Sequence, residues 1–164
     1  MFKWFQALSS RAKSRDASGE KLDPPLAALE RGDYATAERL LTEAIDSAEG
    51  PQARAFFFNK RGVARVKLER RADARHDFER ALECDARCAP ALTNLGNLLF
   101  DEGRINEALD AYRAAVDADP DHALAYANLS AALKRAGRIE EAVRAMRTAQ
   151  RLEGRKGTRP TKRP

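Results

Sequence analysis

The sequence predicts an all-α protein, a right-handed α-solenoid of about four antiparallel helix pairs, and three observations lead to this fold class. Similar residues recur every 34 positions, a spacing typical of stacked helical repeats. Within each repeat, apolar residues follow a helical period that glycine or proline interrupts. The 164 residues are 43% hydrophobic but only 7% aromatic, which favours helices over strands.

The 34-residue period is visible in five columns of three copies each. The columns hold a small residue (Gly62, Gly96, Ser130), an alanine (Ala74, Ala108, Ala142), a large side chain (Phe78, Tyr112, Met146), a second alanine (Ala81, Ala115, Ala149) and an apolar or aromatic residue (Phe58, Leu92, Tyr126). The first two columns are 12 residues apart. We therefore expect the small residue and the alanine to lie where the paired helices cross most closely.

The first helix pair is expected to be truncated. Its first helix can begin no earlier than about Pro24 and ends at Gly32. The second helix of this pair repeats the pattern of the later copies, with Tyr34 in the place of Ile105. Three extra residues relative to the period are expected in the turn at 47–52.

The later pairs have clearer boundaries. Gly103 and Gly137 separate the two helices of the third and fourth pairs, and Pro120 separates these pairs from each other. The second pair departs from the pattern, because Glu69 stands where the turn glycine is expected and Ala86 stands where the proline is expected.

These motifs resemble the tetratricopeptide repeat family over about residues 20–152. The third copy matches the family pattern best, through Leu92, Leu95, Gly96, Leu99, Gly103, Ala108, Tyr112, Ala115 and Pro120. The resemblance implies three well-formed units plus one truncated N-terminal pair. It also implies a protein that binds other proteins, without naming the partner.

Two arginines of the second pair occupy positions that are leucine in the later copies. An unpaired charge at a core position is costly, so Arg61 and Arg65 need partners. We expect them to face the preceding pair and meet carboxylates such as Glu38, Glu43 or Asp46. The alternative is that their long side chains reach water along the helix surface.

The charge distribution divides the chain into three parts. Residues 1–20 are a basic amphipathic arm, residues 21–152 are the repeat domain, and residues 153–164 are expected to be a basic, disordered tail. The arm contains Phe2, Trp4, Phe5 and Leu8 followed by basic residues. Three roles stay open for it: capping the first pair, docking residues 1–15 on an anionic membrane surface, or targeting the chain.

The concave surface of the predicted solenoid is the candidate binding site. Its exposed stripe comprises Lys60, Val63 and Lys67, then Asn94, Asn97 and Asp101, then Asn128, Ala131 and Arg135. Asn94 and Asn128 occupy the same repeat position, and each amide offers a donor and an acceptor that could hold the backbone of an extended peptide. Lys60, Lys67 and Arg135 would favour an acidic segment. The alternative is that these asparagines bond only to water or to a neighbouring helix.

One group within the family, which clamps the carboxylate tails of heat-shock chaperones, is not indicated. The opening lysine and asparagine of that clamp would fall on Asn59 and Val63, or on Leu22 and Leu26. The resemblance therefore does not extend to this ligand.

No catalytic motif is present, so the sequence predicts that the protein is not an enzyme and uses no cofactor. Cys84 and Cys88 are expected to be free thiols rather than metal ligands.

The predicted function is a cytoplasmic adaptor that binds a peptide segment of another protein. The alternative is a scaffolding factor at a membrane surface that self-associates through its repeats. Sequence-specific nucleic-acid binding is not expected, because the basic tail has no aromatic residue.

Overall fold

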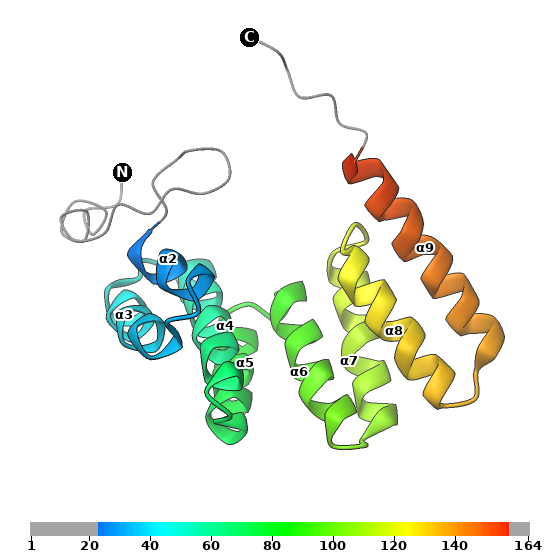
Figure 1. Cartoon of the computed structure of the whole chain (residues 1–164), viewed down its shortest axis with the longest axis horizontal. Coiled ribbons are helices and arrows are strands. Elements are labelled where there is room, and N and C mark those ends of the chain that lie inside the picture. Colours follow the sequence, from blue (N-terminus) through cyan, green and yellow to red (C-terminus); the bar gives the residue numbers. More distant parts are fainter. Residues whose placement is uncertain (1–22, 158–164) are drawn as a thin grey trace, which may run out of the picture. The chain divides into compact units, whose positions relative to one another are not determined.

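The computed structural model describes residues 23–157, and these residues form eight helices and no strand (Figure 1). They divide into two compact units, one up to Ala86 and one from Arg87 onward. Each unit contains two helix pairs. The predicted all-α helical repeat fold is therefore confirmed. The predictions for the arm at residues 1–20 lie outside the described residues.

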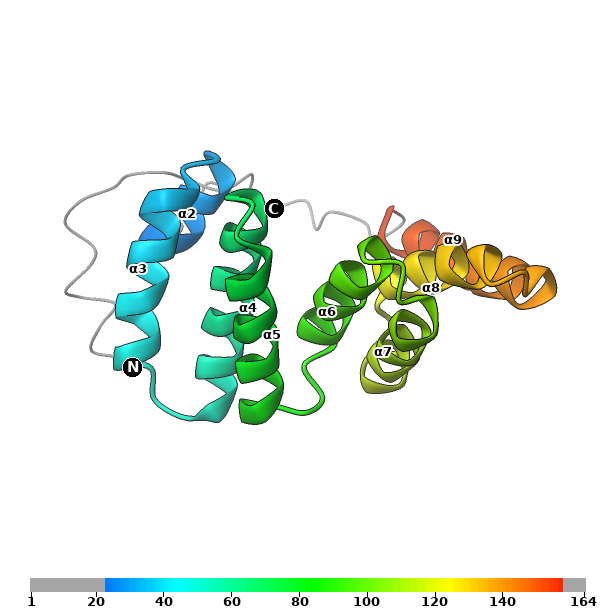
Figure 2. The same ribbon diagram turned by 90° about the horizontal axis from the view of Figure 1, so that it is seen from below.

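The described part of the first unit, residues 23–86, is built from four helices, and α4 lies between α3 and α5 (Figure 2). The helices are α2 (Pro24–Glu30), α3 (Tyr34–Ser47), α4 (Pro51–Lys67) and α5 (Arg71–Cys84). As predicted, α2 is short: proline occupies its first turn, and Gly32 follows it with a φ of 74°, a conformation that glycine adopts without strain.

The second unit holds the best-formed repeats. Its helices are α6 (Ala89–Asp101), α7 (Ile105–Ala118), α8 (Ala123–Arg135) and α9 (Ile139–Gly157). The prediction of a tail from residue 153 needs correction, because α9 continues to Gly157. Leu152, directly before the expected boundary, is buried, and the helix continues past it with Glu153, Gly154 and Arg155 exposed. Residues 158–164 lie outside the described residues.

The glycines of the repeat mark close packing inside each helix pair. A Cβ added to Gly62 would lie 2.5 Å from the ring of Phe78, and one added to Gly96 would lie 2.6 Å from the ring of Tyr112. The expected close approach is present, but a ring rather than the alanine column fills it in these two pairs. In the fourth pair, Ser130 instead donates a hydrogen bond to the backbone carbonyl of Ala142 at 2.7 Å.

Glu69 adopts the left-handed backbone conformation that the other repeats assign to glycine. Its φ is 61°, close to the 78° of Gly103 at the equivalent turn. The amide of Arg70 donates to the carbonyl of Arg65, as the amide of Arg104 does to that of Leu99. The same helix-ending hydrogen bonds therefore form in both turns, with backbone strain at Glu69.

Glu69→Gly is expected to raise the free energy of unfolding by about 1 kcal/mol, because glycine removes the steric cost of the left-handed conformation. Chemical denaturation followed by circular dichroism measures the change. Glu69→Ala is the matched control, since it removes the same side chain but keeps the Cβ. Equal stabilisation by both variants would contradict a backbone origin.

Arg61 and Arg65 form a buried ion cluster with Glu38 and Asp77. Arg61 lies 2.7 Å from Asp77, and Arg65 lies 3.0 Å from Asp77 and 2.8 Å from Glu38. Asp77 is completely buried, whereas the two arginine side chains are 12% and 15% exposed. The expected pairing with Glu38 is confirmed for Arg65. The alternative, in which both side chains reach water, is wrong.

The main partner of Arg61 differs from the sequence-based expectation. Its carboxylate partner is Asp77, on the helix that follows, and it also donates to the hydroxyl of Thr42 on α3 at 3.0 Å. Glu43 instead pairs with Arg39 on its own helix, and Asp46 is exposed. The arginines therefore join α3, α4 and α5 rather than only the first two.

Candidate functional site

The second unit places six of the predicted site residues on the adjacent helices α6 and α8. They are Asn94, Asn97 and Asp101 on α6, and Asn128, Ala131 and Arg135 on α8. Spacings of three and four residues put each set on one helix face. The three asparagines are half-buried and the other three residues are exposed. We call these six residues the α6–α8 face.

A hydrogen-bond network orders the centre of the α6–α8 face. The side-chain carbonyl of Asn97 accepts from the hydroxyl of Tyr112 and from the amide of Asn128, both at 2.8 Å. These bonds connect three helices, because Tyr112 lies on α7. The sequence pairs Asn128 with Asn94 by repeat position, but the structure bonds Asn128 to Asn97. The side chain of Asn128 has two N–H donors and one carbonyl acceptor, and this bond uses one of the donors.

Tyr112 is a member of this network that the sequence analysis did not identify as a site residue. It is 2% exposed, and burial raises the pKa of its phenol well above the ordinary value, with the nearby carboxylate of Asp101 adding to the effect. The hydroxyl therefore stays protonated at neutral pH and can donate to Asn97. The sequence contains one signal for this role: Tyr112 carries a hydroxyl group at the repeat position where Phe78 and Met146 have none.

Arg135 carries the positive charge of the α6–α8 face. Its guanidinium group lies 5.5 Å from the centre of the Phe100 ring, so an aromatic side chain supports it from α6. Asp101 follows Phe100 and places a carboxylate on α6. The face thus combines ordered amides with one cationic and one anionic side chain.

The other three predicted residues lie on α4 in the first unit. The ammonium group of Lys60 lies 5.3 Å from the centre of the Phe56 ring, and Phe56 is 42% exposed. Val63 is half-buried and Lys67 is exposed. This helix therefore presents two cations and an exposed aromatic ring.

A recess of about 430 Å³ in the second unit was not anticipated from the sequence. It is lined by Arg113, Tyr126, Leu129, Leu133, Glu141, Arg144, Ala145 and Thr148, from α7, α8 and α9. A hydrogen bond from Arg138 lowers the pKa of Glu141, and the charges of Arg113 and Arg144 act in the same direction. The recess therefore combines apolar side chains with two arginines and one carboxylate.

Helix pairs that recur every 34 residues place both units in the class of helical repeat proteins. A tetratricopeptide repeat model matches residues 59–123 and 93–154, and a second such model matches residues 26–43. These matches span more than half of the chain, so the protein belongs to the tetratricopeptide repeat family. No curated protein is similar enough in sequence to count as a relative. Among residues 23–157, no helix is both long and apolar enough to cross a membrane.

Solved structures share this fold at low sequence identity. The crystal structure of MamA has a TM-score of 0.68 and 21% identity, over 82% of this chain and 77% of MamA. YrrB, described as a TPR protein with an unusual peptide-binding site, has a TM-score of 0.62 and 24% identity, over 79% of this chain and 66% of YrrB. The second TPR of Spaghetti (RPAP3), bound to the HSP90 peptide SRMEEVD, has a TM-score of 0.57 and 21% identity, over 60% of this chain and 91% of that one.

Proposed function

We propose that this protein is a non-enzymatic adaptor that binds an extended peptide segment of another protein on the α6–α8 face. The observation that carries the proposal is the network in which Asn97 fixes the amide of Asn128. A side chain already held in place loses little conformational entropy when a ligand binds. The amide of Asn128 is thus prepared to bond to a peptide backbone.

The charge of the face indicates the class of peptide. Arg135 is exposed and supported by Phe100, so an acidic side chain or a terminal carboxylate of the ligand would pair with it. We further propose that Lys60, Val63 and Lys67 on α4 form a binding surface of the first unit. The two lysines would give this surface the same preference for acidic segments. The peptide ligands named for YrrB and RPAP3 support peptide binding as the general mode.

The ligand of the RPAP3 domain is not proposed for this chain. Asn59 and Val63 stand where a carboxylate clamp would begin with lysine and asparagine. Asn59 is buried and Val63 is half-buried, so neither offers the cationic group that such a clamp needs. A different acidic peptide is therefore expected.

The test selects peptides from a random displayed library on the full chain and measures their affinity by calorimetry. Asn128→Ala is expected to weaken binding about tenfold, since it removes a polar contact to the ligand backbone. Arg135→Glu should weaken acidic peptides selectively. The matched control is Asn106→Ala, which changes an exposed asparagine on α7, outside the α6–α8 face. Equal affinities for the Asn128 and Asn106 variants would place the binding site elsewhere.

A further inference from the structure

Three apolar side chains line the outer side of α9. Ile139, Val143 and Met146 are 55%, 44% and 38% exposed. Their spacing of four and three residues places them on one face of the helix, distinct from the buried face that contains Ala142 and Ala149. We call these three residues the α9 outer stripe.

The preceding repeat shows what such a stripe normally contacts. The equivalent positions on α7 are Ile105, Leu109 and Tyr112, and the last two are each only 2% exposed. They form one apolar core with Leu129 and Leu133 of α8. Within residues 23–157, no helix covers α9 in the way that α8 covers α7. The α9 outer stripe is therefore a helix-packing surface without a described partner.

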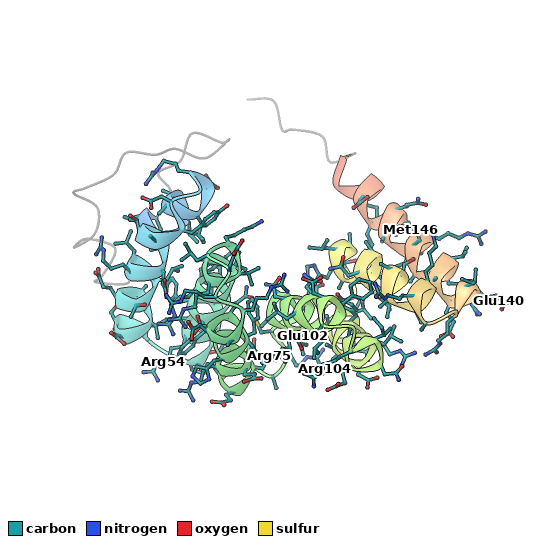
Figure 3. The ribbon with its side chains drawn as sticks, turned by 60° about the horizontal axis from the view of Figure 1, so that its bottom comes forward. Arg54, Arg75, Glu102, Arg104, Glu140 and Met146 are labelled. Carbon is teal, nitrogen blue, oxygen red and sulfur yellow. The ribbon has the colours of Figure 1, made fainter. Side chains whose placement is uncertain are left out.

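The charges beside the stripe distinguish between its candidate occupants. At 100° per residue, Glu140 and Arg147 lie on the same side of the stripe, near its two ends (Figure 3 labels Glu140 and Met146). The only described ion pair of Glu140 is a long contact of 3.7 Å to Arg144, with both side chains mostly exposed. Such a pair contributes little, so Glu140 can exchange it for another arginine.

A second copy of α9 fits this pattern better than the other segments of the chain. In a two-fold antiparallel pair centred next to Val143, the Glu140 of each copy lies opposite the Arg147 of the other. The N-terminal arm carries Phe2 and Trp4 but is basic, so it would bring like charges to Arg147. Residues 158–164 contain no large apolar side chain that could cover the stripe.

We propose that the protein forms a two-fold symmetric dimer in which the α9 outer stripes of two copies pack against each other in antiparallel orientation. Val143 meets its own symmetry mate at the centre of the contact. Ile139 and Met146 extend the apolar contact to both sides, and two Glu140–Arg147 pairs border it. The contact includes no residue of the α6–α8 face. The dimer proposal can therefore be tested independently of the proposed peptide binding.

Sedimentation equilibrium of the full chain over a concentration series tests the proposal. We expect dimers to form in the range of about 10–100 μM, because the contact is small. Val143→Glu should weaken dimerisation at least about tenfold, since it opposes two carboxylates at the symmetry axis. The fold should persist, because Val143 is exposed, and circular dichroism checks this. Leu124→Glu, at an apolar residue of α8 that is 56% exposed, is the matched control and should leave dimerisation unchanged.

A charge exchange identifies the antiparallel register. Glu140→Arg and Arg147→Glu should each weaken the dimer, whereas the double variant should restore it, because each arginine again faces a glutamate. A wild-type chain that stays monomeric to about 500 μM would overturn the proposal. The proposal would also be overturned if the Val143 and Leu124 variants weakened dimerisation equally. The same holds if the charge-exchange double variant dimerised no more tightly than the single variants.

The same samples distinguish the N-terminal arm as occupant. Trp4 is the only tryptophan of the chain, so its fluorescence reports on the arm. If the arm covered the stripe, Val143→Glu would shift the Trp4 emission to longer wavelength in a chain that is monomeric with and without the substitution. That result would overturn the dimer, and unchanged emission together with loss of the dimer would support it.

Discussion

Asp77→Asn is expected to lower the free energy of unfolding of the first unit by about 3–5 kcal/mol. The carboxylate of Asp77 is fully buried and is the shared partner of Arg61 and Arg65. Without it, Arg61 keeps a hydrogen bond to Thr42 but loses its carboxylate partner, while its side chain stays mostly buried. Desolvation of an uncompensated guanidinium group is the physical reason for the large effect.

Chemical denaturation followed by circular dichroism measures this loss, and hydrogen exchange of α3, α4 and α5 assigns it to the first unit. Glu43→Gln is the matched control. It breaks the ion pair of Arg39 and Glu43, whose side chains are 63% and 51% exposed. An exposed pair of this kind contributes less than about 1 kcal/mol. An Asp77 variant as stable as the control would contradict the importance of the buried ion cluster.

The chain itself supplies an apolar version of the cluster. The equivalents of Arg61, Arg65 and Asp77 in the next repeat are Leu95, Leu99 and Ala111. We expect the triple variant Arg61→Leu/Arg65→Leu/Asp77→Ala to recover most of the stability that Asp77→Asn loses, because no charge then stays buried without a partner. Glu38 also lies 2.8 Å from Arg70, so it should keep a cationic partner in this variant. A triple variant as unstable as the single one would show that the site requires polar groups.

Gly96→Ala is expected to lower the free energy of unfolding of the second unit by about 1–3 kcal/mol. The added Cβ would lie 2.6 Å from the ring of Tyr112, which is buried and hydrogen-bonded to Asn97 and so cannot easily move. Separation of α6 from α7 would be the outcome. The strain outweighs the gain of about 1 kcal/mol that alanine normally gives inside a helix.

Gly154→Ala is the matched control for this substitution. Gly154 also lies in a helix, but a Cβ at this position meets no atom within 4 Å. The control is therefore expected to be neutral or stabilising by up to about 1 kcal/mol in the same denaturation experiment. If both alanine variants changed stability in the same direction, close packing at Gly96 would not be the cause.

Much of the fold could be predicted because each repeat carries its own local signals. Pro24 and Gly32 bound the short first helix as expected, and Gly103 and Gly137 end helices with positive φ. Glu69 shows that the turn keeps its geometry even without glycine, because the packed helices on both sides determine the backbone. The end of α9 was less predictable, since glycine and basic residues do not by themselves end a helix.

Repeat spacing predicted which polar residues share a helix face, but it did not predict the hydrogen-bond network between them. Repeat spacing put Asn94 and Asn128 in equivalent positions, and both lie on the α6–α8 face. The bond from Asn128 to Asn97 crosses from one repeat to the next, and the sequence alone does not specify which amide comes within reach. Asp77 was missed for a similar reason, although the equivalent positions of the two later copies, Ala111 and Ala145, are both alanine.

Helical period and turn residues act over a few positions, so the family, the helix pairs and the faces on which polar residues lie could be predicted from the amino-acid order. Packing between helices determines which carboxylate meets Arg61, which amide holds Asn128, and that Val143 is exposed while Leu109 is buried. These outcomes depend on the reach of long side chains and on which helices pack against each other. Neither is encoded within a single repeat.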